Sequence, residues 1–335
     1  MKKFQKVSVI GGGAWGTALA LTAARAGRDV ILWARDPDTV QEIRSRQQNS
    51  KYLPGITFDE TIKATLDLKE TLNADAVLLV TPAQTTRAML KQIAAAGGFQ
   101  GPLVLCAKGI EQSTGKLLSE VLKEELPGSE IAVLSGPSFA DDVARGLPTA
   151  VTIAAETTET ADSLCEAMAA PAFRPYATTD VTGTLIGGAL KNVLAIASGA
   201  VAGAKLGASA QAALTARGFA ELSRLGASLG AKPETLTGLS GLGDLVLTCS
   251  TPQSRNFSFG IKLGEGQKAS EIIAAGGKLA EGAYTAKVAV ELAKKLHVDL
   301  PICQTVAAMI EEGLSVKEAL RTLMSRPLKA ETGNT

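Results

Sequence analysis

The chain has 335 residues, enough for two domains, and its 46% hydrophobic and 20% charged residues are an ordinary globular balance. A net charge of +1 gives no basic excess for nucleic acid or an anionic membrane, and 4% aromatic residues are few for stacking single-stranded bases. The four cysteines are widely spaced and form no C-x-x-C pair, so we expect buried thiols in a cytoplasmic, reducing compartment and no metal site.

The first clear signal is a glycine pattern near the start of the chain. Gly11, Gly13 and Gly16 fit G-x-G-x-x-G between an apolar run at 7–10 and an alanine-rich stretch that leads to a second apolar run at 29–33. This strand–turn–helix–strand order predicts a dinucleotide site. Gly11 permits the turn, Gly13 lets the backbone approach a pyrophosphate, and Gly16 lets helix and strand pack closely. A tight turn without a ligand is the alternative.

The end of the second predicted strand bears on the choice of cofactor. NAD-selective units usually place an acidic residue there to hold the ribose hydroxyls. Arg35 stands at this point instead, and a guanidinium can bind the 2′-phosphate of NADP(H). A solvated loop arginine is the alternative, and the neighbouring Asp36 keeps NAD(H) open as a second cofactor.

Strand-like and helical runs alternate through the first half of the chain, whereas strand signals almost vanish after Val181. The expected strands after the opening unit are 76–80, 103–107 and 131–134, with weaker signals at 150–154 and 173–177, and the helices between them include 84–96 and 116–126. Such alternation predicts an α/β fold with a parallel sheet covered by helices on both faces. We therefore expect a Rossmann-like domain at 1–182 and an all-helical domain at 183–335, packed closely without a flexible linker.

One lysine stands out in the second half. Lys191 lies in an otherwise apolar stretch, GGALKNVLAIASGAVAG, where a charge is costly unless it is paired or has a purpose. Burial would lower its pKa toward the range useful for acid–base catalysis. A lysine that snorkels from a packed helix is the alternative. The uncharged part, 192–204, is too short to span a bilayer.

The only histidine, His297, lies at a lysine-rich helix end and is expected to be solvated. A histidine-based proton donor, as in lactate- and malate-type dehydrogenases, is therefore not expected. Two further segments suit anion binding: SGPSFA at 135–140, and a glycine-rich stretch at 241–244 that leads to Ser254-Arg255-Asn256. Arg255 is a candidate phosphate clamp and Asp244 a candidate partner for the lysine ammonium, although each segment alone fits an ordinary glycine-rich loop.

Several segments together resemble bacterial NAD(P)-dependent glycerol-3-phosphate dehydrogenases. They follow the family order over nearly the whole chain: GGGAWGTALA (11–20), LWARD (32–36), YLPG (52–55), CAKGIE (106–111), SGPSFA (135–140), LKNVLAIASG (190–199), GLGDLVLTCS (241–250), SRNFSFG (254–260) and EG (281–282). The resemblance implies an N-terminal Rossmann-like domain, a helical C-terminal domain of the 6-phosphogluconate dehydrogenase type, and a cytoplasmic homodimer without membrane insertion. The sn-glycerol 3-phosphate that such an enzyme makes would feed phospholipid biosynthesis.

The resemblance also implies roles for individual residues, with Lys191 as the proton donor and acceptor. Dihydroxyacetone phosphate or sn-glycerol 3-phosphate would contact Lys108, Gly136, Ser138, Lys191, Asp244, Ser254, Arg255 and Asn256. The cofactor, NADP(H) with NAD(H) as a second candidate, would contact Gly11, Gly13, Ala14, Trp15, Gly16, Arg35, Lys108, Ala140, Arg255, Leu279 and Glu281. No metal is implied.

Two other functions compete with this interpretation. A β-hydroxyacid or ketopantoate-type reductase shares the Rossmann domain, the helical domain and the lysine, but its substrate carries a carboxylate and no phosphate. A nicotinamide-sensing binding protein would need no turnover. The presence of Lys191, Asp244 and Arg255 together favours an enzyme, and the Ser254-Arg255-Asn256 segment favours a phosphorylated substrate.

Overall fold

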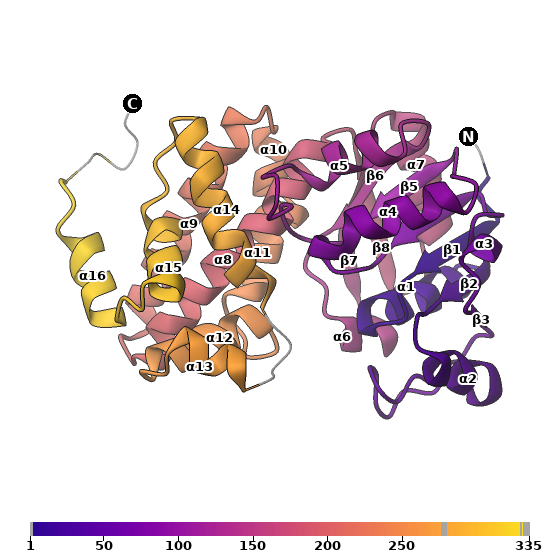
Figure 1. Ribbon diagram of the computed structural model, residues 1–335, viewed down its shortest axis with the longest axis horizontal. Helices are drawn as coiled ribbons and strands as arrows, with labels where there is room; N and C mark the ends of the chain where they lie inside the picture. Colours follow the sequence, from indigo (N-terminus) through magenta and orange to yellow (C-terminus); the bar gives the residue numbers. More distant parts are fainter. Residues whose placement is uncertain (1–2, 276–279, 329, 331–335) are drawn as a thin grey trace.

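The computed structural model of the protein describes residues 3–275, 280–328 and 330. A helix-covered sheet occupies one half of the molecule and a helical bundle the other, side by side (Figure 1). The sheet uses the chain up to Thr178, and beyond it the described residues form helices and connecting loops only. The predicted α/β fold is confirmed.

The sheet has eight strands in the order β3-β2-β1-β4-β5-β6-β7-β8. The strands are β1 (Lys6–Ile10), β2 (Asp29–Trp33), β3 (Lys63–Thr65), β4 (Ala76–Leu79), β5 (Pro102–Leu105), β6 (Glu130–Ser135), β7 (Thr149–Ala155) and β8 (Phe173–Thr178). The first six are parallel and follow the Rossmann order, which opens a crevice at the carboxyl ends of β1 and β4. The segments that the sequence singled out after β1, β5 and β6 therefore meet at one edge.

The sheet departs from the sequence-based prediction in two places. β7 pairs with β6 in the antiparallel direction, so the predicted parallel sheet contains one antiparallel pair. A parallel crossover needs a long connection that returns along the sheet, whereas the link from β6 to β7 contains only the five-residue helix α6 (Ala140–Ala144). β3 was not predicted, because three residues carry no periodic signal.

Helices cover both faces of the sheet, as predicted. Those of the first half are α1 (Ala14–Arg25), α2 (Pro37–Arg46), α3 (Leu68–Thr71), the 3₁₀ turn η1 (Ala83–Thr85), α4 (Thr86–Ala95), α5 (Leu118–Glu125), α6 and α7 (Thr158–Met168). Apolar residues of α1, α2, α6 and α7 form one core on one sheet face. Residues of α4 and α5, which lie in front of the sheet in Figure 1, form a second core on the other face.

That second core continues without a break into the helical half, so the two halves pack closely. The helical half contains α8 (Val181–Gly203), α9 (Ala208–Ser228), α10 (Pro233–Thr237), the π-helical turn η2 (Leu239–Gly243), α11 (Asp244–Thr248), α12 (Arg255–Gly264), α13 (Ala269–Ala274), α14 (Glu281–Lys295), α15 (Pro301–Glu311) and α16 (Val316–Met324).

Helix α8 is longer than the apolar segment that the sequence suggested. Its 23 residues have a mean hydropathy of 1.6, so by length and composition alone it is able to cross a membrane, which corrects the expectation that the stretch is too short. However, 94% of its apolar window is buried inside the protein. The helix thus serves as the central element around which the rest of this half packs.

Candidate active site

The glycine turn has the geometry expected of a dinucleotide site. Gly11 has a φ of +133°, and a Cβ there would lie 2.6 Å from the carbonyl oxygen of Val80. A Cβ on Gly16 would lie 1.8 Å from the carbonyl oxygen of Gly11, so only glycine allows this close approach of helix and turn. At Gly13 a Cβ would meet nothing within 4 Å. Neighbouring backbone therefore crowds the turn at Gly11 and Gly16, whereas the space at Gly13 is open to a ligand.

Polar groups around the turn fit a bound nucleotide. No side chain caps α1 at Gly13, which leaves the first amides of the helix free for an anion. The hydroxyl of Thr81, which lies beside Gly11, is buried and has no hydrogen-bond partner among the described residues. Ala14 and Trp15 are half-buried at the start of the helix. The residues present therefore fit the dinucleotide that the sequence predicts.

Arg35 and Asp36, at the end of β2, differ in how far their side chains are engaged. Arg35 is exposed. Asp36 caps α2 by accepting from the amide of Asp38 over 3.1 Å, and it pairs with the Lys51 ammonium over 2.6 Å. The hydrogen bond from Lys51 is the main reason that the pKa of Asp36 is lowered. With the Thr39 hydroxyl, which donates to it over 3.2 Å, the Asp36 carboxylate already has three partners. Of the two neighbours, Arg35 is therefore the one whose side chain is available to meet the cofactor.

Close packing of α8 against α12 places the catalytic candidates. A Cβ on Gly199 would lie 2.0 Å from the carbonyl oxygen of Phe257, and one on Gly260 would lie 2.1 Å from that of Ile196. The two helix backbones are therefore nearly in contact. This packing brings the N-terminus of α12, with Ser254-Arg255-Asn256, next to the middle of α8, where Lys191 and Asn192 lie.

Two lysines and one aspartate meet between the two halves of the molecule. The Lys191 ammonium donates to Asp244 Oδ1 and, over 2.8 Å, to the hydroxyl of Thr248. The Lys108 ammonium comes from the loop after β5 and donates to Asp244 Oδ2 over 2.6 Å and to the carbonyl oxygen of Gly136 over 3.1 Å. Asp244 thus joins a lysine of the sheet half to a lysine of the helical half.

Burial controls the protonation of this cluster. Lys191 is 5% exposed and Asp244 1%. Burial lowers the pKa of Lys191 to about 7, against the opposing effect of Asp244 and with further lowering by Lys108. Burial alone would raise the pKa of Asp244, but the two ammonium groups outweigh it and keep that pKa below its usual value. The cluster therefore keeps a charged carboxylate beside Lys191. The pKa of Lys191 near neutrality is the property that a general acid or base needs.

Two asparagines tie the N-terminus of α12 to the cluster. The side-chain amide of Asn256 donates to Asn192 Oδ1 over 2.9 Å, and its oxygen accepts from the backbone amide of Gly282 over 2.9 Å. Ser254 is buried and caps α12 by accepting from Phe257. Arg255 is exposed in the first turn of the helix. An arginine at a helix N-terminus suits a phosphate group.

The segment after β6 contributes backbone and hydroxyl groups beside Lys108. Gly136 has a φ of +146°, and a Cβ there would lie 2.9 Å from Val151 Cα, so the position accepts only glycine without a shift of β7. The Ser138 hydroxyl donates to the carbonyl oxygen of Gly136 over 3.1 Å. Ala140 begins α6.

Glu281 lies near the cluster, because the charges of Arg255, Lys108 and Lys191 all act on its carboxyl group and Gly282 beside it binds Asn256. Glu281 begins α14 and accepts from the amide of Ala83 over 3.5 Å, and burial raises the pKa of its carboxyl group. Leu279 lies outside the described residues. His297 is exposed just after α14, as expected.

Thr248 contacts Lys191, although the sequence analysis did not assign it to the site. It stands four positions after Asp244, on the same face of α11, and accepts from the same ammonium. That i, i+4 spacing was the available signal. The expectation of four buried thiols is corrected for Cys165, which is only partly buried, whereas Cys106, Cys249 and Cys303 are buried.

Comparison with known proteins bears directly on this site. The family described as NAD-dependent glycerol-3-phosphate dehydrogenase matches the chain with its N-terminal model over residues 6–161 and its C-terminal model over residues 180–321. The chain belongs to this family. The family resemblance found in the sequence is thereby confirmed.

Similar proteins support the assignment over the full length. A Rhodopseudomonas palustris protein named glycerol-3-phosphate dehydrogenase (NAD(P)+) is 56% identical over 99% of this chain and 100% of its own, and one of the same name from Parvibaculum lavamentivorans is 53% identical over 98% and 99%. A crystal structure of glycerol-3-phosphate dehydrogenase from Coxiella burnetii matches with a TM-score of 0.90 at 40% identity, over 96% of this chain and 99% of that one. A ketopantoate reductase from Ralstonia eutropha shares the fold, with a TM-score of 0.58 at 18% identity.

Proposed function

We propose that this family member is a glycerol-3-phosphate dehydrogenase that transfers hydride reversibly between NAD(P)H and dihydroxyacetone phosphate, giving sn-glycerol 3-phosphate. The observation that carries the proposal is the buried Lys191–Asp244–Lys108 cluster at the edge of the sheet that carries the glycine turn. It joins a group able to move a proton near neutral pH to a site built for a dinucleotide.

The chain's own residues would move the proton and hold the substrate. Lys191, as an ammonium, would give its proton to the oxygen on C2 as that oxygen gains negative charge, and the resulting amine would stay held by Asp244 and Thr248. Lys108 would stabilise the same developing charge. When bound, the reduced nicotinamide supplies the hydride to C2. In the reverse direction neutral Lys191 would accept the proton of the alcohol.

Binding of the phosphate group would fix the reacting carbon in place. Arg255 and the N-terminus of α12 supply donors for it, and Asn256 is held rigidly by Asn192 and Gly282. Gly136 and Ser138 would line the other side of the substrate, next to Lys108. Binding energy from this remote group would then orient the carbonyl between Lys191 and the nicotinamide.

The substrate is tested by comparing dihydroxyacetone phosphate with dihydroxyacetone. We expect NADPH oxidation with the first and little with the second, because the second lacks the group that Arg255 and α12 would bind. The measurement is kcat/KM by absorbance at matched enzyme concentration, with a ketone that carries a carboxylate and no phosphate as a third arm. Equal kcat/KM for the two dihydroxyacetone compounds contradicts the phosphate site, and preference for the carboxylate ketone favours a ketopantoate-type reductase.

The choice of cofactor is tested by a change of charge at Arg35. Exposed Arg35 supports use of NADP(H), because Asp36 is already bound to Lys51 and the α2 N-terminus. Arg35→Asp should raise the Kd of NADPH much more than that of NADH, since it replaces an attraction for the 2′-phosphate with a repulsion. Quenching of protein fluorescence by each cofactor measures both values, with Arg46→Asp on α2 as a matched charge control. An unchanged Kd for NADPH would make Arg35 an ordinary surface residue.

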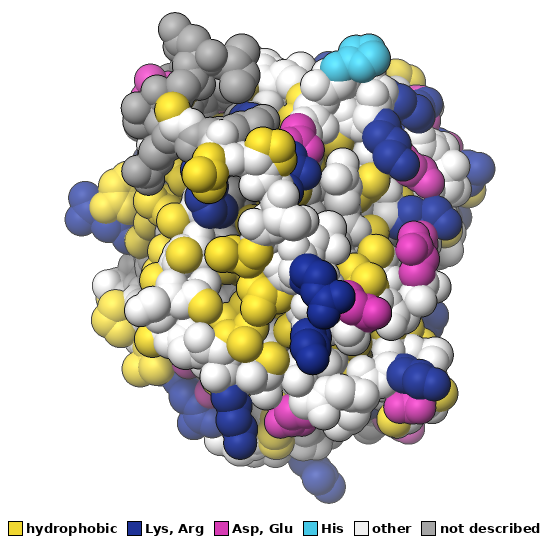
Figure 2. All heavy atoms as spheres, turned by 90° about the vertical axis from the view of Figure 1, so that its left-hand side faces the viewer, with side chains coloured by type: hydrophobic (Ala, Val, Ile, Leu, Met, Phe, Trp, Pro, Cys, Tyr) yellow, Lys and Arg dark blue, Asp and Glu magenta, His cyan; other side chains and the backbone are white. Residues whose placement is uncertain are grey.

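We also propose a homodimer. The supporting observation is a groove between α9 and α11, lined mainly by apolar residues. Figure 2 shows hydrophobic side chains gathered across the helical end of the molecule. Exposed apolar residues of this half include Leu206, Leu242, Val246, Leu320 and Met324. Light scattering of the purified protein gives its mass directly.

Two broader expectations rest on the family resemblance. We propose that the protein works in the cytoplasm and that its product enters phospholipid biosynthesis. We also propose the domain boundary at residue 182, which the change from sheet to helices near Val181 supports.

A further inference from the structure

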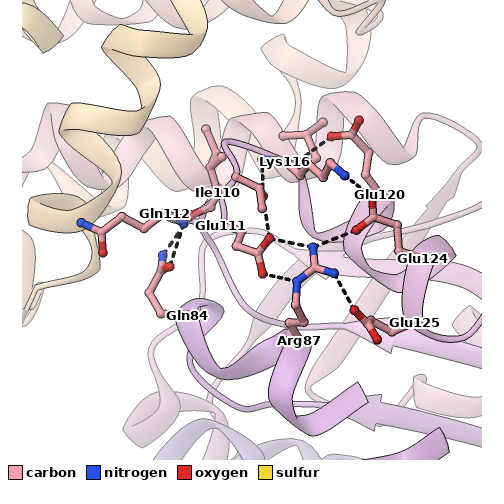
Figure 3. Close-up of polar contacts among 11 residues, drawn as sticks. Gln84, Arg87, Ile110, Glu111, Gln112, Lys116, Glu120, Glu124 and Glu125 are labelled. Atoms are coloured by element: carbon pink, nitrogen blue, oxygen red, sulfur yellow. Dashed lines mark hydrogen bonds and ion pairs between the residues drawn. The ribbon is translucent and has the colours of Figure 1, made fainter. Parts of the chain in front are cut away.

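The loop that carries Lys108 is anchored by a charged cluster outside the candidate active site. This loop, 106–117, joins β5 to α5, and its Lys108 contacts Asp244 of the helical half. Glu111, three residues after Lys108, is only 6% exposed. Its carboxylate accepts from Nε and Nη2 of Arg87 on α4, both over 2.8 Å (Figure 3). A paired fork of this kind fixes both orientation and distance.

The other groups around Arg87 hold it in place for Glu111. Glu125 and Glu124 on α5 accept from Arg87 over 2.5 and 2.8 Å, so one guanidinium ties α4, α5 and the loop together (Figure 3). Lys116 pairs with Glu124 from the end of the same loop. The hydrogen bond from Arg87 is the main reason that the pKa of Glu111 is lowered, so its carboxylate stays charged at neutral pH.

Backbone contacts hold the same loop on both sides of Glu111. The side chain of Gln84 donates to the carbonyl oxygen of Ile110 and accepts from the amide of Gln112, both over 2.9 Å (Figure 3). The Thr114 hydroxyl donates to Glu111 over 2.5 Å. The backbone next to Lys108 is therefore fixed to α4 and η1, and the long lysine side chain starts from a defined point on its way to Asp244.

We propose that Glu111, held by Arg87, is a positioning residue that sets Lys108 against Asp244. It touches neither the candidate substrate site nor Asp244, and it acts through the placement of the loop. The loss of Glu111 would free the loop, so the Lys108 ammonium would leave Asp244 and Gly136 for part of the time. The catalytic consequence rests on the proposed function, whereas the effect on the position of Lys108 does not.

A double-mutant cycle tests whether Glu111 affects catalysis through Lys108. Glu111→Gln keeps the size of the side chain and removes its charge, and we expect kcat/KM for dihydroxyacetone phosphate to fall about tenfold, within the range seen for coupled neighbours. With Lys108→Met already in place, the same change should cost less than about twofold, because the group that it positions is gone. Glu125→Gln is the matched control, since it removes a charge from the same arginine without touching the loop.

Chemical labelling gives a readout that does not depend on activity. Acetylation of lysines by a water-soluble acylating reagent, followed by mass spectrometry, should proceed severalfold faster at Lys108 in Glu111→Gln than in the wild type, and unchanged in Glu125→Gln. If Glu111→Gln does not fold, Gln84→Met carries the same tests, because Gln84 is exposed and binds the loop on both sides of Glu111.

The outcomes separate this proposal from the proposed function. Additive losses in the cycle, or unchanged labelling of Lys108, overturn the positioning role even if the enzyme turns over its substrate normally. If the wild type does not reduce dihydroxyacetone phosphate, the proposed function fails, and faster labelling of Lys108 in Glu111→Gln still supports the role of Glu111.

Discussion

Lys191→Ala is expected to lower kcat for dihydroxyacetone phosphate by ~10²–10⁴, the usual contribution of a general acid. Lys191 is the ionisable group that burial brings to a pKa of about 7, and it contacts Asp244 and Thr248 directly. The variant should still fold, because Asp244 keeps its ion pair with Lys108. Its Kd for NADPH should be unchanged, since the cofactor phosphates would bind at the glycine turn.

The control for this variant is the single histidine. His297→Ala should leave kcat within about twofold of the wild type, because surface changes away from a site have small effects. Both variants are assayed with matched NADPH titrations by fluorescence. Wild-type kcat in Lys191→Ala, or a large loss in His297→Ala, would overturn the proposed mechanism.

Local sequence patterns were sufficient for most of the strands but not for their pairing. The weaker apolar signal at 150–154 predicted β7, yet the direction of the strand follows from the short link through α6, which does not return along the sheet. Hydrophobic periodicity records which residues are buried, not which neighbour a strand meets. The length of a segment decided what was predicted. The long apolar stretches of the helical half give a strong signal, whereas the three residues of β3 give none.

The sequence was sufficient to predict a contact of the candidate site where a buried charge needs a partner of opposite charge. A charge in an apolar helix is costly unless it is paired. Asp244, the partner that the sequence suggested, does contact Lys191 although 53 positions separate them. The link from Lys108 to Asp244 spans 136 positions and depends on the packing of the two halves. Neither spacing nor composition encodes it, and only the family resemblance suggested that Lys108 belongs to the site.

The pH dependence of the reaction should show the titration of Lys191. Reduction of the ketone needs the ammonium, so its rate should fall as pH rises through about 7. Oxidation of the alcohol needs the neutral amine, so its rate should rise through the same pH. Opposite signs in the two directions distinguish titration of one proton donor from a general loss of the folded state.

Asp244→Asn should displace this titration to lower pH. The carboxylate opposes the lowering of the Lys191 pKa that burial and Lys108 cause, and without it only the lowering effects remain. The falling limb of ketone reduction should therefore move by roughly one to three pH units, the usual effect of a close opposite charge. At pH 7.5 the variant should reduce its ketone much more slowly, whereas alcohol oxidation should extend to lower pH.

Thermal unfolding must be followed in the same variant, because the loss of one partner of a buried pair costs about 3–5 kcal/mol. The matched control is Asp299→Asn, which removes an exposed carboxylate paired with Arg326 in the helical half. It should leave both pH profiles unchanged. Profiles of Asp244→Asn that coincide with the wild type would mean that Asp244 does not set the protonation of Lys191, and that its ion pairs serve only to hold the two halves of the molecule together.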